Sequence, residues 1–219
     1  MTPAVTKHTA GQAHDSGVSL MDFRLLYDGP LASEGDRFQK HEIRRALHPQ
    51  LSALWQHHPV LDRIKQTRVG DVDPSTGGFQ TRFTELVNKF RKEPFRFVPL
   101  VTESLNLVCT LDILFLRREA PGSLVNNKGD TDNRIKTLFD ALRYPGEPNE
   151  LDGIVPQGVD ETNLFFCLLE DDKLIVGYSV VTDILLKPPA DRASRNHVSI
   201  LLNVRVKPTI VTNENLVFA

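Results

Sequence analysis

The sequence predicts an α/β fold in which a mixed sheet of about four to five strands is flanked by helices. Residues 100–118 are apolar at most positions, as in a central strand covered by helices. Residues 135–142 carry apolar side chains at i, i+3, i+4 and i+7, which is the pattern of one buried helix face. Further strand-like runs occur at residues 19–28, 174–186 and 197–206.

The composition fits one globular domain with polar ends. The chain has 219 residues, 40% of them hydrophobic, and a formal net charge of −2. A chain of this length can bury a sufficient core without cross-links. We expect a flexible tail at residues 1–18 and a single domain at 19–207, with insertions at about 59–95 and 144–162. Residues 208–219 are expected to be a loosely attached C-terminal tail or a swapped arm.

No feature of the sequence indicates secretion or contact with a membrane. The first residues lack an apolar signal segment, and Asp112 interrupts the longest apolar run. Cys109 and Cys167 lie in strand-like apolar runs and are expected to be buried free thiols. We therefore expect a cytoplasmic protein in a reducing compartment.

The first half of the chain is expected to contain two helices joined by connecting chain. Residues 33–58 carry an approximate apolar stripe, which Pro49 should interrupt or restart. Residues 59–78 are marked by glycine and proline and are expected to be connecting chain. Residues 81–94 suggest a short helix with basic residues at its far end.

Basic side chains cluster on the first of these helices and around residues 134–143. They form either a solvated helix face or a surface that follows a phosphate backbone, and the sequence leaves both open. The near-neutral net charge does not favour a generic nucleic-acid binder. The candidates for nucleic-acid contact are Arg37, Lys40, Arg44, Arg45, Arg134 and Arg143.

The insertion at residues 144–162 carries only acidic charges among its prolines and glycines. Loops of this length are usually functional or disordered. Next to an active site, its charge would repel a phosphate backbone. It could serve as a lid, a selectivity element or a dimer contact.

The most informative stretch is residues 128–142, which read KGDTDNRIKTLFDAL. Asp132 and Lys136 are four residues apart and share a flank of the helix, while Asp130 precedes the first turn. Neighbouring carboxylates repel each other unless a cation lies between them, and a divalent ion with oxygen ligands is one solution. The structural alternatives are that Asp132 caps the helix and that Lys136 pairs with Asp132 or Asp140.

This stretch, with a later Asp-Asp pair before a strand, resembles the RusA family of Holliday-junction resolvases. The matching residues are Asp130, Asp132, Asn133, Lys136, residues 139–142, Asp171 and Asp172. The resemblance covers about residues 100–207, or half of the chain. It implies a RusA-like fold and a homodimeric, Mg²⁺-dependent endodeoxyribonuclease of crossover-junction type, acting on four-way DNA junctions in recombination and repair. The two insertions and the near-neutral charge depart from the family pattern.

The resemblance also implies the roles of the matching residues. Asp130, Asp132 and Asp172 become the metal ligands and, with Lys136, the catalytic residues. Lys136 would orient a nucleophile or offset charge on the phosphoryl oxygens. The expected ion is Mg²⁺, with Mn²⁺ able to substitute.

Three more polar residues are candidates for supporting roles. Asn133 is expected to hold the helix start, and Asp171 neighbours the third acid of the motif. Asp112 either has a hydrogen-bond partner near the sheet edge or contributes a further carboxylate. These are possible second-shell or additional ligands.

Two other functions remain open from the sequence. The chain could be a non-catalytic binding module that has kept the fold, which the net charge and the acidic insertion favour. It could also be a nuclease for another branched, flapped or single-stranded substrate. No Gly-rich phosphate loop with Lys-Ser/Thr and no Gly-x-Ser-x-Gly segment is present, which argues against those enzyme classes.

Overall fold

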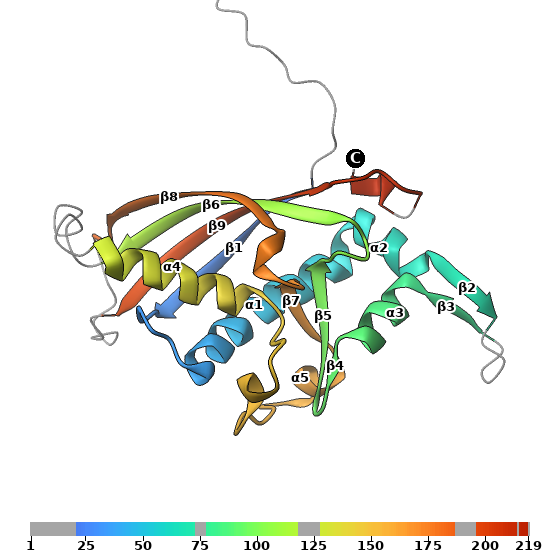
Figure 1. Ribbon diagram of the computed structural model, residues 1–219, viewed down its shortest axis with the longest axis horizontal. Coiled ribbons are helices and arrows are strands. Elements are labelled where there is room, and N and C mark those ends of the chain that lie inside the picture. The colour runs from blue at the N-terminus through green and yellow to red at the C-terminus, as the bar shows by residue number, and fades with distance from the viewer. Residues whose placement is uncertain (1–20, 73–77, 118–127, 187–195, 214, 219) are drawn as a thin grey trace, which may run out of the picture.

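A computed structural model shows the fold, in which a mixed four-stranded sheet is accompanied by smaller sheets and several helices (Figure 1). The structure describes residues 21–72, 78–117, 128–186, 196–213 and 215–218. The predicted α/β class, with a mixed sheet flanked by helices, is confirmed. The N-terminal tail expected at residues 1–18 lies outside the described residues.

The large sheet has the strand order β1-β9-β6-β8. Strand β9 is antiparallel to both of its neighbours, whereas β6 and β8 are parallel. Alternate side chains of β6 are buried, and those between them are mostly half-buried, so one face of the strand forms the core. The four strands are β1 (Met21–Pro30), β6 (Leu107–Arg117), β8 (Ile175–Ile184) and β9 (His197–Pro208).

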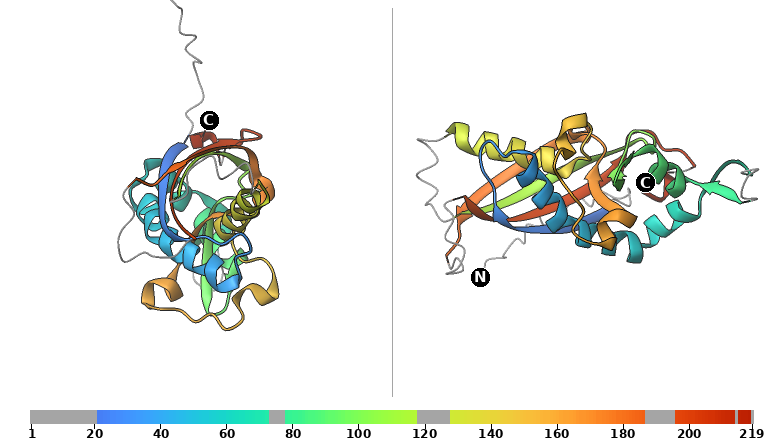
Figure 2. Two further views of the ribbon diagram at one scale, coloured as in Figure 1. Left: turned by 90° about the vertical axis from the view of Figure 1, so that its left-hand side faces the viewer. Right: turned by 90° about the horizontal axis from the view of Figure 1, so that it is seen from below.

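The sheet bends into an arc, and helices α1 (Arg37–His57) and α4 (Lys128–Leu142) lie on its concave side (Figure 2). Both helices bury an apolar stripe, because removing this surface from water is the main favourable contribution to folding. The buried apolar residues are Ile43, Leu47, Leu51, Trp55, Ile135, Leu138 and Leu142. Within the described chain, no helix is both long enough and apolar enough to span a bilayer.

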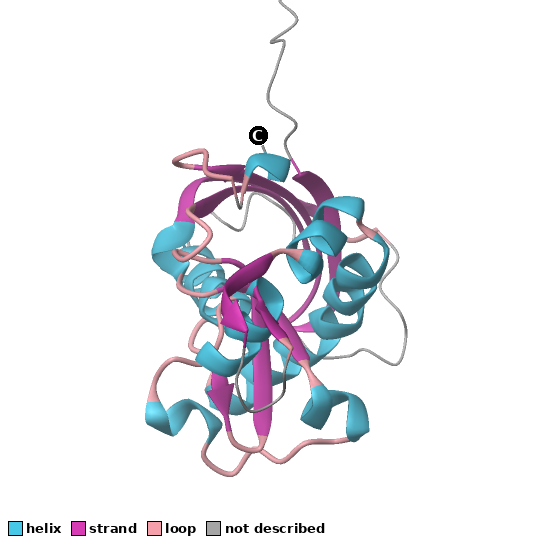
Figure 3. Ribbon diagram, turned by 90° about the vertical axis from the view of Figure 1, so that its right-hand side faces the viewer, coloured by secondary structure: helices cyan, strands magenta, loops and turns pink. Residues whose placement is uncertain are grey.

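A smaller sheet packs against α1 below the large one (Figure 3). It contains β4 (Arg91–Lys92), β5 (Phe95–Val101) and β7 (Phe165–Leu169), with β5 and β7 parallel. The single strand expected over residues 100–118 is therefore wrong. The chain turns between β5 and β6, where Asn106 has a φ of 52°, a left-handed conformation that asparagine tolerates.

Two further expectations for the first half are corrected. Pro49 lies inside α1, which continues through it. Proline inside a helix costs about 3 kcal/mol, and the buried stripe on both sides of Pro49 offsets that cost. Residues 59–78 are not plain connecting chain, because Pro59 occupies the first turn of a new helix that buries Leu61 and Ile64.

The first insertion is thus a structured unit at one end of the molecule. It comprises α2 (Pro59–Gln66), the antiparallel pair β2 (Arg68–Val72) and β3 (Phe79–Thr81), and α3 (Arg82–Lys89). Helix α3 is the short helix predicted within residues 81–94, and its basic end leads into β4.

The described C-terminal residues are attached to the domain rather than loose. Asn215 is buried and donates hydrogen bonds of 2.8 Å to the carbonyl oxygens of Leu105 and Ile210. Phe218, in the short helix η4 (Leu216–Phe218), is fully buried. The sequence missed this attachment because it depends on one amide and one ring rather than on a repeated pattern.

His41 is a fully buried histidine on α1 that packs against Phe95 and Phe165. Neither of its ring nitrogens has a hydrogen-bond partner in the described structure. Burial, together with the positive charges of Arg45 and Arg44, lowers the pKa of His41 from 6.5 to about 3. The unfolded chain therefore binds a proton here at a pH where the folded chain does not.

We predict that the free energy of unfolding decreases as the pH falls below about 6.5, by up to about 1.4 kcal/mol per pH unit from this group. The variant His41→Phe, which keeps an aromatic ring among aromatic neighbours, should have a shallower pH dependence. Urea unfolding at several pH values between about 7 and 4.5 measures the slope. The exposed His57→Gln variant is the control, and an unchanged slope for His41→Phe would contradict this assignment.

Candidate functional site

Helix α4 carries the predicted motif. It begins at Lys128, so Asp132 is its fifth residue and not its N-cap. The capping alternative for Asp132 is therefore wrong, because the backbone is already helical one turn earlier. The predicted apolar stripe is confirmed, since Ile135, Leu138 and Leu142 are at most 5% exposed.

The three polar residues of the motif face solvent. Asp132, Asn133 and Lys136 are exposed, and none of them has a hydrogen bond or ion pair with any described residue. The alternative ion pairs of Lys136 are also wrong, because Asp140 instead pairs with Lys40 at 2.6 Å. In the described structure, this polar flank therefore has no stabilising role.

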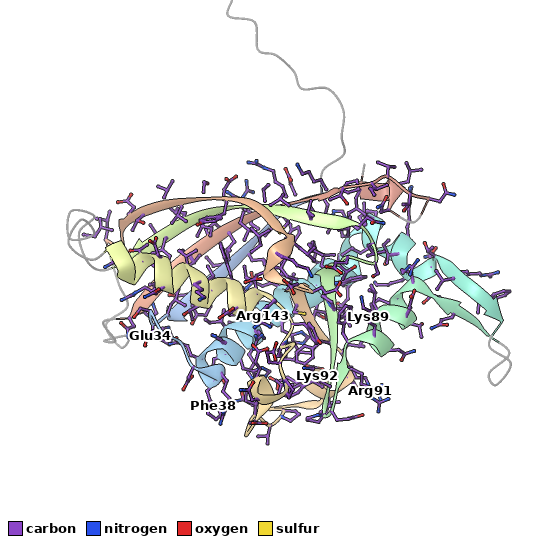
Figure 4. The ribbon with its side chains drawn as sticks, in the orientation of Figure 1. Glu34, Phe38, Lys89, Arg91, Lys92 and Arg143 are labelled. Carbon is purple, nitrogen blue, oxygen red and sulfur yellow. The ribbon has the colours of Figure 1, made fainter. Side chains whose placement is uncertain are left out.

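Asp172 lies near the other end of the same helix. It begins η3 (Asp172–Leu174), which leads into β8, and its side chain is exposed. Burial by itself lowers the pKa of Arg143. The negative charges of Glu150, Asp140 and Asp172 outweigh this effect, so the pKa of Arg143 lies above its ordinary value. The short helix η3 contacts α4, and Arg143 directly follows the last residue of α4 (Figure 4).

The sheet register separates the two acidic ends of the motif. At one end, Arg117 pairs with Ile184 and donates a hydrogen bond of 3.5 Å to the Thr131 hydroxyl of α4. At the other end, Cys109 pairs with Ile175, three residues after Asp172. Strands rise about 3.3 Å per residue, so the Cys109–Ile175 pair and the Arg117–Ile184 pair lie roughly 25–30 Å apart.

The length of the helix leads to the same conclusion. Asp132 and Arg143 are separated by eleven residues, or about 16 Å of helix. Two metal ions that share carboxylate ligands lie only about 4 Å apart. Asp132 and Asp172 of one chain are too far apart for such a centre.

Two of the three expected metal ligands, Asp132 and Asp172, therefore do not come together within one chain. Asp132 and Asp172 are separated, and the side chain of Asp130 lies outside the described residues. Among the described side chains, no group of three His, Cys, Asp or Glu could hold a metal ion. The reason is topological: α4 follows β6 and runs back antiparallel to β6 and β8, so its first turn lies near the end of β8 and far from its start.

The two remaining acidic candidates have structural partners. Asp112 accepts hydrogen bonds from Ser179 at 2.8 Å and from Arg205 at 2.7 Å, on the sheet face opposite α4. This is the structural alternative that the sequence left open for Asp112. Asp171 is the N-cap of η3 and accepts a hydrogen bond from the backbone amide of Lys173 at 3.0 Å.

A cleft of about 380 Å³ lies between α4, the start of α1 and the loop that precedes α1. Asn133 and Lys136 of the motif line it, and Lys40 and Asp140 form an ion pair along its wall. Glu34, from the loop before α1, also lines the cleft. The cleft thus combines polar donors with both signs of charge, and the motif is part of its surface.

Two of the six basic residues predicted to contact nucleic acid are buried, and that prediction is wrong for them. Arg44 is 2% exposed and donates hydrogen bonds to the carbonyl oxygens of Arg143 at 2.9 Å and Asp140 at 2.7 Å. Burial lowers the pKa of Arg44 to about 10, so it remains cationic at neutral pH. Arg134 is 6% exposed and donates to the Asn196 side chain at 3.3 Å.

Acidic residues of the second insertion neutralise two of the others. Arg143 forms a two-pronged pair with Glu150, with both distances 3.0 Å. Arg45 pairs with Glu161 at 2.8 Å. The acidic insertion is therefore attached to α1 and the end of α4, in the helices η2 (Pro148–Leu151) and α5 (Val159–Asn163).

The sequence contained a signal for the burial of Arg44 that the first interpretation did not use. His41, Arg44, His48, Leu51 and Trp55 recur at helical spacing and are all buried, so they form one continuous stripe. A polar residue inside such a stripe is expected to be paired within the core. His48 follows the same rule, because its Nδ1 accepts a hydrogen bond of 2.9 Å from the Phe166 backbone amide.

Both cysteines are buried free thiols, as predicted. Burial raises the pKa of Cys109 to about 12 and also raises that of Cys167, so neither supplies a thiolate nucleophile at neutral pH.

Comparison with protein-family models, curated proteins and solved structures yields no match to this chain. The argument for function therefore depends on the motif and its geometry.

We predict that Arg44→Met lowers the free energy of unfolding by about 2–4 kcal/mol, because it leaves the last carbonyl groups of α4 without their donors. Arg37→Met, on the exposed face of the same helix, should change it by no more than about 0.5 kcal/mol. Urea titration followed by circular dichroism measures both. Similar losses for the two variants would contradict the structural role of Arg44.

Proposed function

We propose that the protein is a structure-selective DNA endonuclease of RusA type. One observation supports this above all: Asp132, Asn133 and Lys136 are exposed at the start of α4 and have no structural partner among the described residues. Their spacing matches the resolvase motif, while the apolar positions of the same helix are used for packing. Residues that contribute nothing to the core are candidates for contact with substrate.

The chemistry of these side chains suits a phosphodiester group. The Lys136 ammonium can offset negative charge on the phosphoryl oxygens. The Asn133 amide can donate a hydrogen bond to a substrate oxygen, and the Asp132 carboxylate can orient an attacking water. The cleft beside them gives a phosphodiester access to Asn133 and Lys136.

The resemblance also implies Mg²⁺, for which Mn²⁺ could substitute. Within one chain the described carboxylates do not fit this ion, because Asp132 and Asp172 lie at opposite ends of α4. Among the described residues of the motif, Asp132, Asn133 and Lys136 are the groups that one chain can bring to a phosphodiester here.

The proposed substrate is a four-way DNA junction, and the proposed active form is a homodimer. Both follow from the resemblance, and a two-fold assembly supplies the two equivalent sites that paired incision requires. The free, buried thiols suit a reducing compartment, which supports the cytoplasm as the proposed location.

A non-catalytic binding protein is the second candidate. The observation that favours it is the neutralisation of Arg45 and Arg143 by Glu161 and Glu150, which reduces the free positive charge available to DNA. Such a protein would retain a bound junction without cutting it.

We predict that Asp132→Asn and Lys136→Gln each lower the rate of junction cleavage at least about 100-fold, because each removes a group that acts on the phosphodiester. The assay follows a labelled four-way junction with Mg²⁺ or Mn²⁺ on a denaturing gel. Flapped and single-stranded DNA are run beside it to identify the preferred substrate.

The matched control is Asp22→Asn, an exposed acid on β1 at the opposite edge of the sheet, which should cut at the wild-type rate. Wild-type cleavage by Asp132→Asn would exclude Asp132 from the chemistry. Junction binding without cleavage by the wild type, at any metal concentration, would favour the binding protein.

A further inference from the structure

A second cleft opens between α1 and α5, apart from the cleft beside Lys136. Its volume is about 380 Å³, and its lining comes from the second half of α1, from α5 and from the start of β7. The two clefts have no lining residue in common. The polar side chains around the second cleft are those of His48, Ser52, Gln56, Asp160 and Asn163.

The wall formed by α5 is held against α1 by Arg45. The Arg45 guanidinium pairs with Glu161 at 2.8 Å and donates a hydrogen bond of 2.6 Å to the carbonyl oxygen of Val155. The Glu161 carboxylate also accepts a hydrogen bond of 2.9 Å from the backbone amide of Gln157. The cleft is therefore formed without a ligand, and the acidic insertion supplies one side of it.

His48 is the feature of this cleft that points to a ligand. Its ring is 9% exposed and stacks on Phe165, with the ring centroids 4.6 Å apart. Nδ1 accepts a hydrogen bond of 2.9 Å from the Phe166 backbone amide, so in the neutral ring the proton lies on Nε2. Burial lowers the pKa of His48 below its ordinary value, which keeps the ring neutral at pH 7. The Nε2–H group is accessible and has no partner among the described residues, so the cleft contains an unused donor.

The rest of the lining defines the chemistry of that ligand. Among the described residues that line the cleft, Asp160 is the one with a charge, and its exposed carboxylate only accepts hydrogen bonds. A ligand must therefore offer an acceptor to His48 and an N–H donor to Asp160, and an anionic group is disfavoured. Leu164 and Phe166 add apolar surface against which a flat ring can pack.

We propose that this cleft binds one unpaired nucleobase of a DNA strand. Nucleobases carry acceptors and N–H donors side by side on their edges, and their faces are apolar. Enzymes that hold a base out of the stack bind it by hydrogen bonds to its edge and by apolar side chains against its ring. The volume suits one base with its sugar, and the described lining contains no lysine or arginine that would draw a phosphate inside. This inference rests on the proposed function, because a nucleic-acid substrate is what presents such a base.

The position of the cleft determines what a bound base would do. Lys40, which lines the same cleft as Lys136, is eight residues before His48 on α1, or about 12 Å along the helix axis. Successive nucleotides of one strand are about 3.4 Å apart along a duplex. A base in this cleft is therefore several nucleotides from a phosphodiester at Lys136, so it positions the substrate and takes no part in the cutting.

Calorimetric titration with free nucleosides tests the site without DNA cleavage. We expect the full-length protein to bind at least one of the four deoxynucleosides with a Kd of about 1 mM or tighter, and not to bind deoxyribose, which lacks a base. Ala53→Trp, at an exposed position in the lining, fills the cleft and should abolish binding. Asp160→Asn should weaken binding at least about fivefold, because a neutral acceptor replaces a charged one.

The matched control is Asp152→Asn, an exposed acid of the same insertion that does not line the cleft. It should bind like the wild type, and circular dichroism shows whether each variant is folded. The proposed site is overturned if none of the four deoxynucleosides gives saturable binding, or if folded Ala53→Trp and Asp160→Asn both bind like the wild type.

A duplex with one bulged base tests the site on DNA. The wild type should bind this duplex about 10-fold more tightly than the same duplex with an abasic nucleotide at the bulge, because only the first presents a base to stack and hydrogen-bond. Ala53→Trp should bind both duplexes equally. Equal affinity of the wild type for the two duplexes would contradict the proposal.

These measurements separate the inference from the function on which it rests. If the protein binds nucleosides but cuts no DNA, the proposed nuclease fails and the base site stands. If it cuts a four-way junction but binds no nucleoside, the base site is overturned while the nuclease stands.

Discussion

The arrangement of this protein depends on the burial of one face of α4 against the large sheet. Ile135, Leu138 and Leu142 are removed from water there, and each such side chain contributes roughly 1.5–3 kcal/mol. Parallel neighbouring strands need a crossover connection, and the one between β6 and β8 begins with α4, which returns antiparallel to both strands, and continues through α5 and β7. The same packing that stabilises the domain therefore holds Asp132 and Asp172 at opposite ends. Uniting them within one chain would expose this buried face.

A second constraint is electrostatic and joins α1, α4 and the acidic insertion. Arg44 is buried among the last carbonyl groups of α4, and Glu150 and Glu161 hold Arg143 and Arg45 in ion pairs. An unpaired buried guanidinium would be costly, so the hydrogen bonds from Arg44 to the Arg143 and Asp140 carbonyl oxygens are required once Arg44 is buried. The acidic residues Glu150 and Glu161, which were expected to repel a phosphate backbone, thus form ion pairs with basic residues of the same chain. The flank of α4 that carries Lys136 is not affected by this neutralisation.

The sequence was sufficient to predict features that depend on short-range periodicity. The stripe of α4 and most strands of the large sheet were predicted because burial on one face imposes a period of 3.6 or 2 residues. Helix α1 through Pro49 and the helix at Pro59 were missed, since tertiary burial outweighed the local effect of proline. The burial of Arg44 could have been inferred, because Arg44 shares a helical stripe with Leu51 and Trp55.

The candidate site marks the limit of such prediction. Spacing along one helix correctly placed Asp132 and Lys136 on one exposed flank, whereas the expectation that Asn133 holds the helix start is wrong, because Asn133 is the sixth residue of α4. The relation of Asp132 to Asp172 was not accessible in the same way, because 40 residues and a crossover separate them. Their relative position depends on the direction of α4 across the sheet, which no local pattern encodes.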